Sequence, residues 1–308
     1  MKMTKTKINL PNFLIVGAAK SGTTSLYYYL KQHPEIYLPK IKECKFFSHM
    51  TGDYKGPGDE EDLNKQIIKT LDDYKLLFAN TTDEKAIGDI SPDYLYYFHE
   101  SIKNIKSILG NNVKILIILR NPIERAYSKY LHNVREGFET LSFEEALKEE
   151  NVRKNNNWGW GWYLVESGLY FNQIKTYMDN FSQVQVLFYE DLLKNTLDLM
   201  KRIFLFLEID PNFIPNIEVK FNASGKPKNK FINNMLVRPS FPKTILKGLT
   251  KPFLSDDKRR ELKESLRAKN TEKISMEEDT RAYLRDVFKE DVLKLQALIN
   301  KDLSYWLA

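Results

Sequence analysis

Apolar and polar positions along this chain fall into short apolar runs, each followed by a stretch with apolar side chains at helical spacing. Uninterrupted apolar runs of five to seven residues are typical of strands buried on both faces of a sheet. Phe13–Ala18 is such a run, and Val113–Leu119 and Gln185–Tyr189 are similar apart from one polar residue in each, Lys114 and Gln185. Helices are predicted directly after them, over residues 24–32, 123–135 and 191–207. The pattern therefore repeats a strand–loop–helix unit.

Strands that alternate with helices predict an α/β fold, with a central parallel β-sheet flanked by helices and joined by right-handed crossovers. The sequence shows no internal repeat and no Gly/Ser-rich or Pro-rich linker. We therefore expect a single domain over residues 1–308. Two regions, Thr51–Asp62 and Asn151–Trp162, combine glycines with polar residues and are predicted to be surface loops.

Composition places the chain of 308 residues among ordinary globular proteins. With 42% hydrophobic and 29% charged residues, wholesale disorder and a low-complexity fibre are excluded. A single cysteine, Cys44, excludes an intrachain disulfide framework and is predicted to be a small buried side chain rather than a nucleophile. The apolar runs are too short to span a bilayer, so we expect a cytoplasmic protein without a signal peptide.

The net charge of +6 is a mild basic bias, and it is unevenly distributed. Residues 226–269 hold 13 Lys and Arg against 4 Asp and Glu, so this segment carries +9 and the remainder −3. Such a balance suits an anionic ligand and does not require a nucleic-acid partner.

The strongest chemical signal is the segment Gly17–Thr24, which lies between the first strand and the first helix. Such a turn directs successive backbone N–H groups and the positive end of a helix at one point, which suits a phosphate or sulfate. Its glycines have the spacing of the loop G-x-x-x-x-G-K-[ST] of nucleoside triphosphatases, but Thr23 follows Gly22, and the lysine stands earlier, at Lys20.

A metal ion is not expected at this site. Magnesium-dependent phosphoryl transfer needs an acidic residue after a neighbouring strand, and here the strand that ends at Leu119 is followed by Arg120. An arginine at this point favours a second anion bound without metal.

The two motifs together resemble those of sulfotransferases that use 3′-phosphoadenosine-5′-phosphosulfate (PAPS). FLIVGAAKSGTTSLYYYLKQHP resembles their 5′-phosphosulfate loop, and RNPIERAYS, which begins at Arg120 and ends at Ser128, resembles their 3′-phosphate motif. The spacings are closer to the heparan-sulfate type and its bacterial relatives than to the small-phenol type. Further matching segments are ECKFF, GDISPDY, SGLY, YEDL and NASGKP.

This resemblance implies a P-loop-like sulfotransferase fold, with a PAPS-binding core over about residues 10–210 and a nucleotide-covering loop and helical part after it. In such a family Lys20 neutralises the leaving oxygen, and Arg120 and Ser128 bind the 3′-phosphate. The 5′-phosphate is then held by Ser21, Gly22, Thr23 and Thr24. The late loop that covers the nucleotide corresponds to Ser224, Gly225, Lys226 and Lys228, although a solvated basic loop is an alternative for these residues.

For the acceptor side, the resemblance places the general base at Glu43 and a histidine near the acceptor at His132. A helix-face histidine without a catalytic role is the alternative for His132. Asp89 stands where relatives often have Glu and is a candidate substrate contact, but Ile90 replaces a substrate-binding Lys of heparan enzymes. Trp160 and Trp162 either stack on a sugar ring or pack a long insertion.

We therefore expect a PAPS-dependent sulfotransferase that acts on a hydroxyl, or an amine, of a carbohydrate or small molecule. Two other classes stay open at this point: a P-loop kinase or NTPase, which would depend on Mg²⁺, and a non-enzymatic binder of nucleotides or polyanions. The sequence leaves the acceptor and the oligomeric state unassigned.

Overall fold

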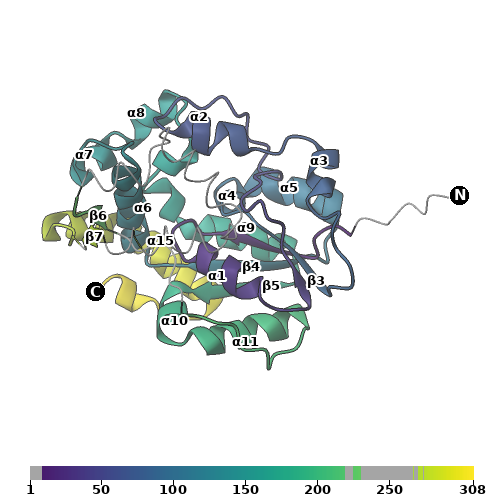
Figure 1. Cartoon of the computed structure of the whole chain (residues 1–308). Coiled ribbons are helices and arrows are strands. Elements are labelled where there is room, and N and C mark those ends of the chain that lie inside the picture. Colours follow the sequence, from purple (N-terminus) through teal and green to yellow (C-terminus); the bar gives the residue numbers. More distant parts are fainter. Residues whose placement is uncertain (1–8, 219–224, 230–265, 267–269, 273) are drawn as a thin grey trace, which may run out of the picture.

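The computed structural model describes residues 9–218, 225–229, 266, 270–272 and 274–308. Its centre is a five-stranded, entirely parallel sheet with the strand order β2-β3-β1-β4-β5 (Figure 1). The strands are β1 (Phe13–Gly17), β2 (Ile36–Tyr37), β3 (Ala86–Ile90), β4 (Lys114–Leu119) and β5 (Val184–Phe188). The predicted α/β fold with a parallel sheet is confirmed.

Helices cover both faces of this sheet. They are α1 (Thr23–Leu30), α2 (Asp59–Asp62), α3 (Leu71–Leu76), α4 (Asp93–Tyr96), α5 (Phe98–Leu109), α6 (Pro122–Glu136), α7 (Phe143–Lys148), α8 (Glu150–Asn155), α9 (Tyr170–Asn180), α10 (Tyr189–Lys194), α11 (Thr196–Leu207) and α15 (Glu278–Ile299). Short 3₁₀ turns are η1 (Asn64–Gln66), η2 (Trp160–Trp162), η3 (Glu166–Gly168) and η4 (Ser304–Trp306). A small antiparallel pair joins β6 (Lys226–Pro227) to β7 (Thr271–Glu272).

The apolar runs are buried on both faces because successive side chains of a strand point to opposite sides. Leu14 and Val16 of β1 belong to a core that contains residues of α5, α6, α9 and α15. Phe13 and Ile15 belong to the opposite core, which contains residues of α1 and α11. Every residue of β1 is buried, which is the environment that an uninterrupted apolar run indicates, and every residue of β3 is buried as well.

The strand order brings the two anion-binding motifs together. β1 and β4 are hydrogen-bonded neighbours, and Ala18 N–H donates to Ile118 C=O at 2.8 Å just beyond the end of β1. After β1 the chain forms β2 and β3, which lie on one side of β1 in the sheet. It then forms β4 and β5 on the other side of β1. Such a reversal leaves a crevice at the carboxyl ends of the strands, where open α/β sheets bind ligands. The loop after β1 and the segment after β4 flank this crevice.

Several element boundaries differ from the sequence prediction. The helix predicted over 191–207 is two helices, α10 and α11, because Asn195 leaves the helical conformation and caps α11 by accepting from Asp198 N–H. The predicted loop Asn151–Trp162 begins inside α8, and the predicted loop Thr51–Asp62 ends in α2. Strands β2 and β3 were not predicted, because Ile36–Tyr37 is only two residues long and Ala86–Ile90 contains Gly88 and Asp89.

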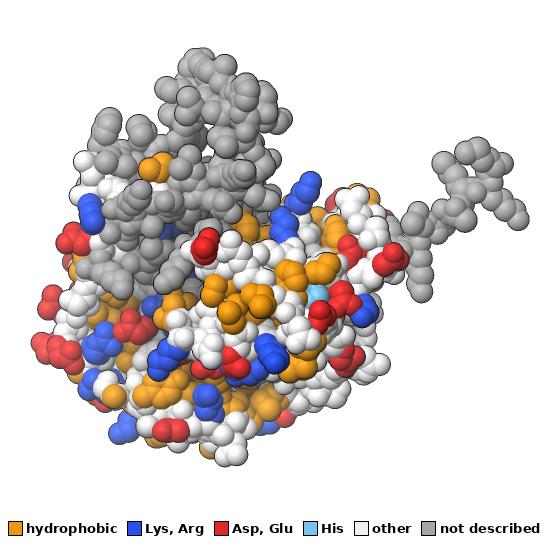
Figure 2. Space-filling model, turned by 60° about the horizontal axis from the view of Figure 1, so that its bottom comes forward, with side chains coloured by type: hydrophobic (Ala, Val, Ile, Leu, Met, Phe, Trp, Pro, Cys, Tyr) orange, Lys and Arg blue, Asp and Glu red, His pale blue; other side chains and the backbone are white. Residues whose placement is uncertain are grey.

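The surface over α10 and α11 carries no dominant charge in its described part. Figure 2 turns this side of the molecule toward the viewer, and charged side chains of both signs are interspersed there with apolar ones. The exposed apolar side chains on these two helices include Leu193, Leu197 and Leu205. None of the helices that the structure describes has the length and apolar character needed to cross a membrane.

Candidate active site

A cavity of about 260 Å³ lies at the carboxyl ends of β1 and β4. It brings together the loop after β1 with the segment after β4 and the first three turns of α6, about a hundred residues further along the sequence. Its lining includes the predicted residues Lys20, Gly22, Thr23, Thr24, Glu43, Arg120, Ser128, His132 and Trp160. The two motifs identified in the sequence therefore meet in one cavity.

The loop after β1 exposes backbone donors to this cavity. Gly22 has φ +93°, a left-handed conformation, and a Cβ at this position would lie 2.5 Å from Leu192 Cδ2, so both strain and space favour glycine. Gly22 is the N-cap of α1, and no side chain caps the helix there. The N–H groups at the start of a helix have no intrahelical partner, so they can donate to an anion. Thr23, Thr24 and Ser25 line the cavity at this helix end.

Arg120 links the two motifs directly. Its Nη1 donates to the Lys20 carbonyl oxygen at 3.2 Å, and its guanidinium lies 4.7 Å from the centre of the Tyr189 ring. The side chain is 15% exposed, and Glu124 Oε2 is 4.0 Å from its Nη2. Ser128, two turns further along α6, is buried at the wall of the same cavity. A planar guanidinium held in this way suits bidentate binding of a phosphate.

The cationic groups gather closely enough to affect one another. Burial, together with the positive charges of Arg135, Lys129 and Arg120, holds the pKa of Lys20 well below its usual value, and Glu43 opposes this effect. A cation whose pKa is lowered by neighbouring cations is stabilised when an anion binds beside it. The electrostatics of the cavity thus favour a ligand with more than one negative charge.

Glu43 lines the same cavity and lies in the loop that follows β2. Its backbone N–H donates to Ile90 C=O at 3.0 Å, and Lys42 forms an ion pair with its carboxylate. Burial works to raise the pKa of Glu43, but the positive charges of Lys42, Lys45 and Lys129 outweigh burial and lower this pKa to about 2. Glu43 is therefore a carboxylate at any ordinary pH, and it can accept a proton only weakly while Lys42 remains paired with it.

Asp89 does not line the cavity, and the expected substrate contact is corrected here. This side chain is 2% exposed. Its carboxylate accepts from Ser91 Oγ at 3.0 Å, from Tyr94 OH at 2.8 Å and from Tyr74 OH at 3.1 Å, and the Cys44 thiol lies 3.3 Å away. Cys44 directly follows Glu43 and is buried, as predicted. Asp89 therefore anchors the loop that carries Glu43 instead of facing a substrate.

A second cavity of about 250 Å³ adjoins the first. Glu43, Lys129, His132 and Trp160 line both cavities, so these side chains mark the junction between them. Trp162 and Phe138 line only the second one. Its aromatic wall and its position next to Glu43 make it a candidate acceptor site.

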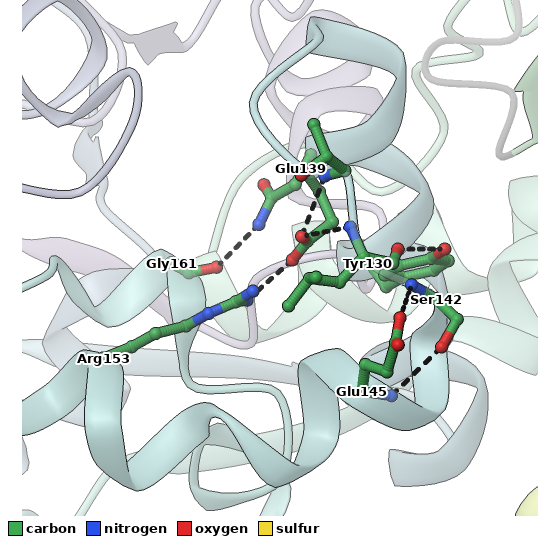
Figure 3. A network of polar contacts seen from close by, with 9 residues as sticks. Tyr130, Glu139, Ser142, Glu145, Arg153 and Gly161 are labelled. Carbon is green, nitrogen blue, oxygen red and sulfur yellow. Dashed lines mark hydrogen bonds and ion pairs between the residues drawn. The ribbon is translucent and has the colours of Figure 1, made fainter.

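A network of polar contacts around Glu139 and Arg153 reaches Gly161, which lies between Trp160 and Trp162 in the sequence (Figure 3). The Glu139 carboxylate accepts from Arg153 Nη1 at 2.6 Å and from the Thr140 and Leu141 N–H groups. The Arg153 guanidinium in turn lies 5.1 Å from the Trp158 ring and 4.9 Å from the Trp162 ring. The segment from Trp158 to Trp162 is thus packed against the rest of the fold. Trp160 and Trp162 also line the second cavity.

Five predicted nucleotide-binding residues are not among the described residues that line this cavity. Ser21 is fully buried next to the loop, and its hydroxyl has no partner among the described residues. Gly225 is buried, and Lys228 is exposed with its N–H donating to Asn270 C=O at 2.8 Å. Lys226 lies opposite Glu272 in the backbone register of β6 and β7. Ser224 and most of the basic segment 226–269 lie outside the described residues.

Sequence reasoning missed three residues with polar side chains that line the first cavity. Ser25 follows the predicted phosphate loop, Lys129 lies next to Ser128, and Tyr189 stacks on Arg120. Tyr189 opens the YEDL segment, which matched the sulfotransferase pattern without a role being assigned to it. Lys129 carried no signal, because a single lysine on a helix is most often a solvated charge.

Comparisons with known proteins agree with this geometry. The family model described as "Sulfotransferase domain" matches residues 10–277. This chain therefore belongs to the sulfotransferase family, which is what its sequence motifs indicated.

Two curated relatives match part of their own length. The chain is 26% identical over 212 residues to the membrane-associated sulfotransferase kil1 of Dictyostelium discoideum, covering 60% of this chain and 42% of that protein. It is 24% identical over 253 residues to mouse heparan sulfate glucosamine 3-O-sulfotransferase 3A1, and this match covers 78% of this chain and 59% of that protein. The chain thus spans less than two thirds of these relatives.

A solved structure matches over almost the whole chain. A sulfotransferase from Alicyclobacillus acidocaldarius is 33% identical, with a TM-score of 0.77, and the match covers 98% of this chain and all of that one. The parallel sheet flanked by helices is therefore the sulfotransferase fold.

Proposed function

We propose that this protein transfers a sulfuryl group from PAPS to a hydroxyl of a carbohydrate or small molecule, an amine being the alternative acceptor. The observation that carries this proposal is the single cavity in which Lys20, the start of α1, Arg120 and Ser128 meet. PAPS has a 5′-phosphosulfate and a separate 3′-phosphate, and the two halves of this cavity offer one cationic cradle for each. The family to which the chain belongs supports the same donor.

In the proposed reaction the acceptor oxygen attacks sulfur in line with the bridging oxygen of the phosphosulfate. A bond forms between sulfur and the acceptor oxygen, the bond from sulfur to the bridging oxygen breaks, and 3′-phosphoadenosine-5′-phosphate (PAP) leaves. Glu43 receives the acceptor proton, and Lys20 neutralises the charge that develops on the leaving oxygen. Preorganised charge of this kind typically contributes a few kcal/mol to the transition state.

The second cavity is the proposed acceptor site. It meets the donor cavity at Glu43, and Trp160, Trp162 and Phe138 give it an aromatic wall. Aromatic rings pack well against the apolar face of a ring-shaped ligand. One relative is named for its action on heparan sulfate glucosamine, which supports a carbohydrate acceptor without fixing which one.

Activity is expected to survive excess EDTA, because Arg120 stands where a metal-binding acid would be needed. The experiment measures transfer of label from ³⁵S-labelled PAPS to a panel of sugar, phenol and amine acceptors, with EDTA or with added Mg²⁺. Labelled product in EDTA supports the proposal. Transfer from ATP that requires Mg²⁺, with none from PAPS, would replace it by a kinase-type reaction.

Removal of Lys42 is expected to strengthen Glu43 as a base. Burial is the largest influence on the pKa of Glu43 and raises it, so in Lys42→Ala fewer positive charges oppose burial and this pKa rises from about 2. The reaction needs ionised Glu43, so kcat/KM falls as the pH drops through this pKa. The acid limb of the pH profile should therefore move to higher pH.

The control for this measurement is Lys40→Ala, which removes an exposed lysine from the same loop. Its profile should match that of the wild type. An acid limb at the same pH in Lys42→Ala and in the wild type would show that Glu43 is not the group whose ionisation the reaction requires.

A further inference from the structure

The ring of His132 contacts a guanidinium, and this contact determines which ring nitrogen can be the acceptor. His132 lies on α6, lines both cavities and is 30% exposed. Its Nδ1 is 2.9 Å from Nη2 of Arg135, one turn further along the same helix. A guanidinium carries only N–H donors and remains charged in proteins. At this distance Nδ1 must therefore present its lone pair, and in the neutral ring the proton is then on Nε2.

Glu136, an acidic side chain near Nδ1, does not reverse this assignment. Glu136 Oε1 is 4.0 Å from Nδ1, which is beyond hydrogen-bond distance, whereas it is 3.2 Å from Nη2 of Arg135. The guanidinium therefore lies between the carboxylate and the ring and takes both as acceptors. Arg135 is also 5% exposed, so little water competes for its donors.

The other charged groups around the junction also favour a neutral ring. Lys20, Lys129 and Arg120 line the same cavity as His132, and among its described lining residues the acidic one is Glu43, which is already paired with Lys42. An additional proton on the ring would add a charge among these cations. It would also require Nδ1 to give up its bond from Arg135.

We infer that Arg135 is a positioning residue that fixes His132 as the Nε2–H tautomer, so that His132 donates a hydrogen bond to the transferring sulfuryl group. This inference rests on the proposed function and deepens it. Sulfuryl oxygens can only accept hydrogen bonds, and His132 lies at the junction that the group crosses between donor and acceptor cavities. A ring whose Nε2 carries a proton cannot take one there, so the role of base stays with Glu43.

The tautomer can be measured without any activity. The chain contains four histidines, so long-range ¹H–¹⁵N correlation spectra of the full ¹⁵N-histidine-labelled protein at mildly alkaline pH are tractable, and His132→Gln identifies the signal. We expect a pyrrole-like shift for Nε2 and a pyridine-like shift for Nδ1. In Arg135→Met the signal should move toward a mixture of tautomers, and Arg135→Lys should restore much of the wild-type pattern. A pyrrole-like Nδ1 in the wild type would overturn the inference.

Two substitutions of His132 separate a donor from a base. Glutamine places an N–H donor near the position of Nε2 but cannot take up a proton, whereas alanine provides neither. We expect His132→Gln to keep kcat within about tenfold of the wild type and His132→Ala to lose about 10²-fold, as for removal of one transition-state donor. PAP affinity, measured by calorimetry, should stay within a few-fold in both. Equal losses in the two variants would refute the donor role.

The outcomes distinguish this inference from the proposed function. If the wild type transfers no sulfuryl group while the Nε2–H tautomer is observed and depends on Arg135, the proposed function fails and the assignment of the ring stands. If transfer occurs but the tautomer is reversed, the inference alone fails.

Discussion

Glu43→Gln is expected to lower kcat by about 10²–10⁴-fold, the usual cost of removing a general base. Glutamine keeps the shape of the side chain and loses only its capacity to accept the acceptor proton. PAP affinity should stay within a few-fold, because the expected phosphate contacts come from Lys20, the start of α1 and Arg120. Steady-state kinetics with PAPS and calorimetry with PAP measure the two quantities separately.

A matched control for Glu43→Gln is Glu60→Gln. Glu60 is also paired with a lysine, Lys65 at 3.5 Å, but it is largely exposed and is not among the described residues that line either cavity. Its substitution should leave kcat unchanged. Near-normal turnover in Glu43→Gln, with His132→Gln inactive, would instead transfer the role of base to His132.

Arg120→Ala is expected to weaken PAP binding by about 10–100-fold. A hydrogen bond to a charged group contributes about 1.5–3 kcal/mol, and each 1.4 kcal/mol corresponds to a factor of ten in affinity. The effect should depend on the ligand, because we assign Arg120 to the 3′-phosphate. Adenosine-5′-phosphosulfate, which lacks that phosphate, should bind wild type and variant with similar affinity.

The four affinities form a cycle of two proteins and two ligands. Arg120 also donates to the Lys20 carbonyl, so some loss through the loop is possible for both ligands, and the cycle removes that shared part. Arg202→Ala, which removes an arginine paired with Asp191 and Asp198 on α10 and α11, is the control for general loss of positive charge. Equal weakening of both ligands in Arg120→Ala would contradict the assignment to the 3′-phosphate.

The sequence predicted the parts of the fold whose signals are local. β1 is an uninterrupted apolar run and is buried along its whole length, and β4 is buried at every position after Lys114. Gly22 was recognisable because a glycine between a strand and a helix permits a tight turn. β3 was missed because Gly88 and Asp89 interrupt its apolar pattern. Asp89 is tolerated in a buried strand only because Ser91, Tyr74 and Tyr94 supply hydrogen bonds to its carboxylate. Contacts of this kind join distant segments and leave no periodic signal.

In the candidate active site, too, the residues with a local sequence signal were predictable and the side-chain contacts were not. Lys20 and Arg120 were predictable because each follows a recognisable strand, and parallel strands end at the same edge of a sheet. The contact between His132 and Arg135 could not be predicted, although the two residues are one helical turn apart. Which of several cations on α6 contacts the ring depends on side-chain conformation, and so does the ion pair that lowers the pKa of Glu43.

The central claim is that one cavity binds both phosphate-bearing ends of the donor nucleotide. A crystal structure of the protein with PAP tests it most directly. We expect the 5′-phosphate at Lys20, Thr23 and Thr24, and the 3′-phosphate at Arg120 and Ser128, with the bridging side of the nucleotide facing Glu43. PAP bound in the reverse direction, or outside this cavity, would contradict the claim.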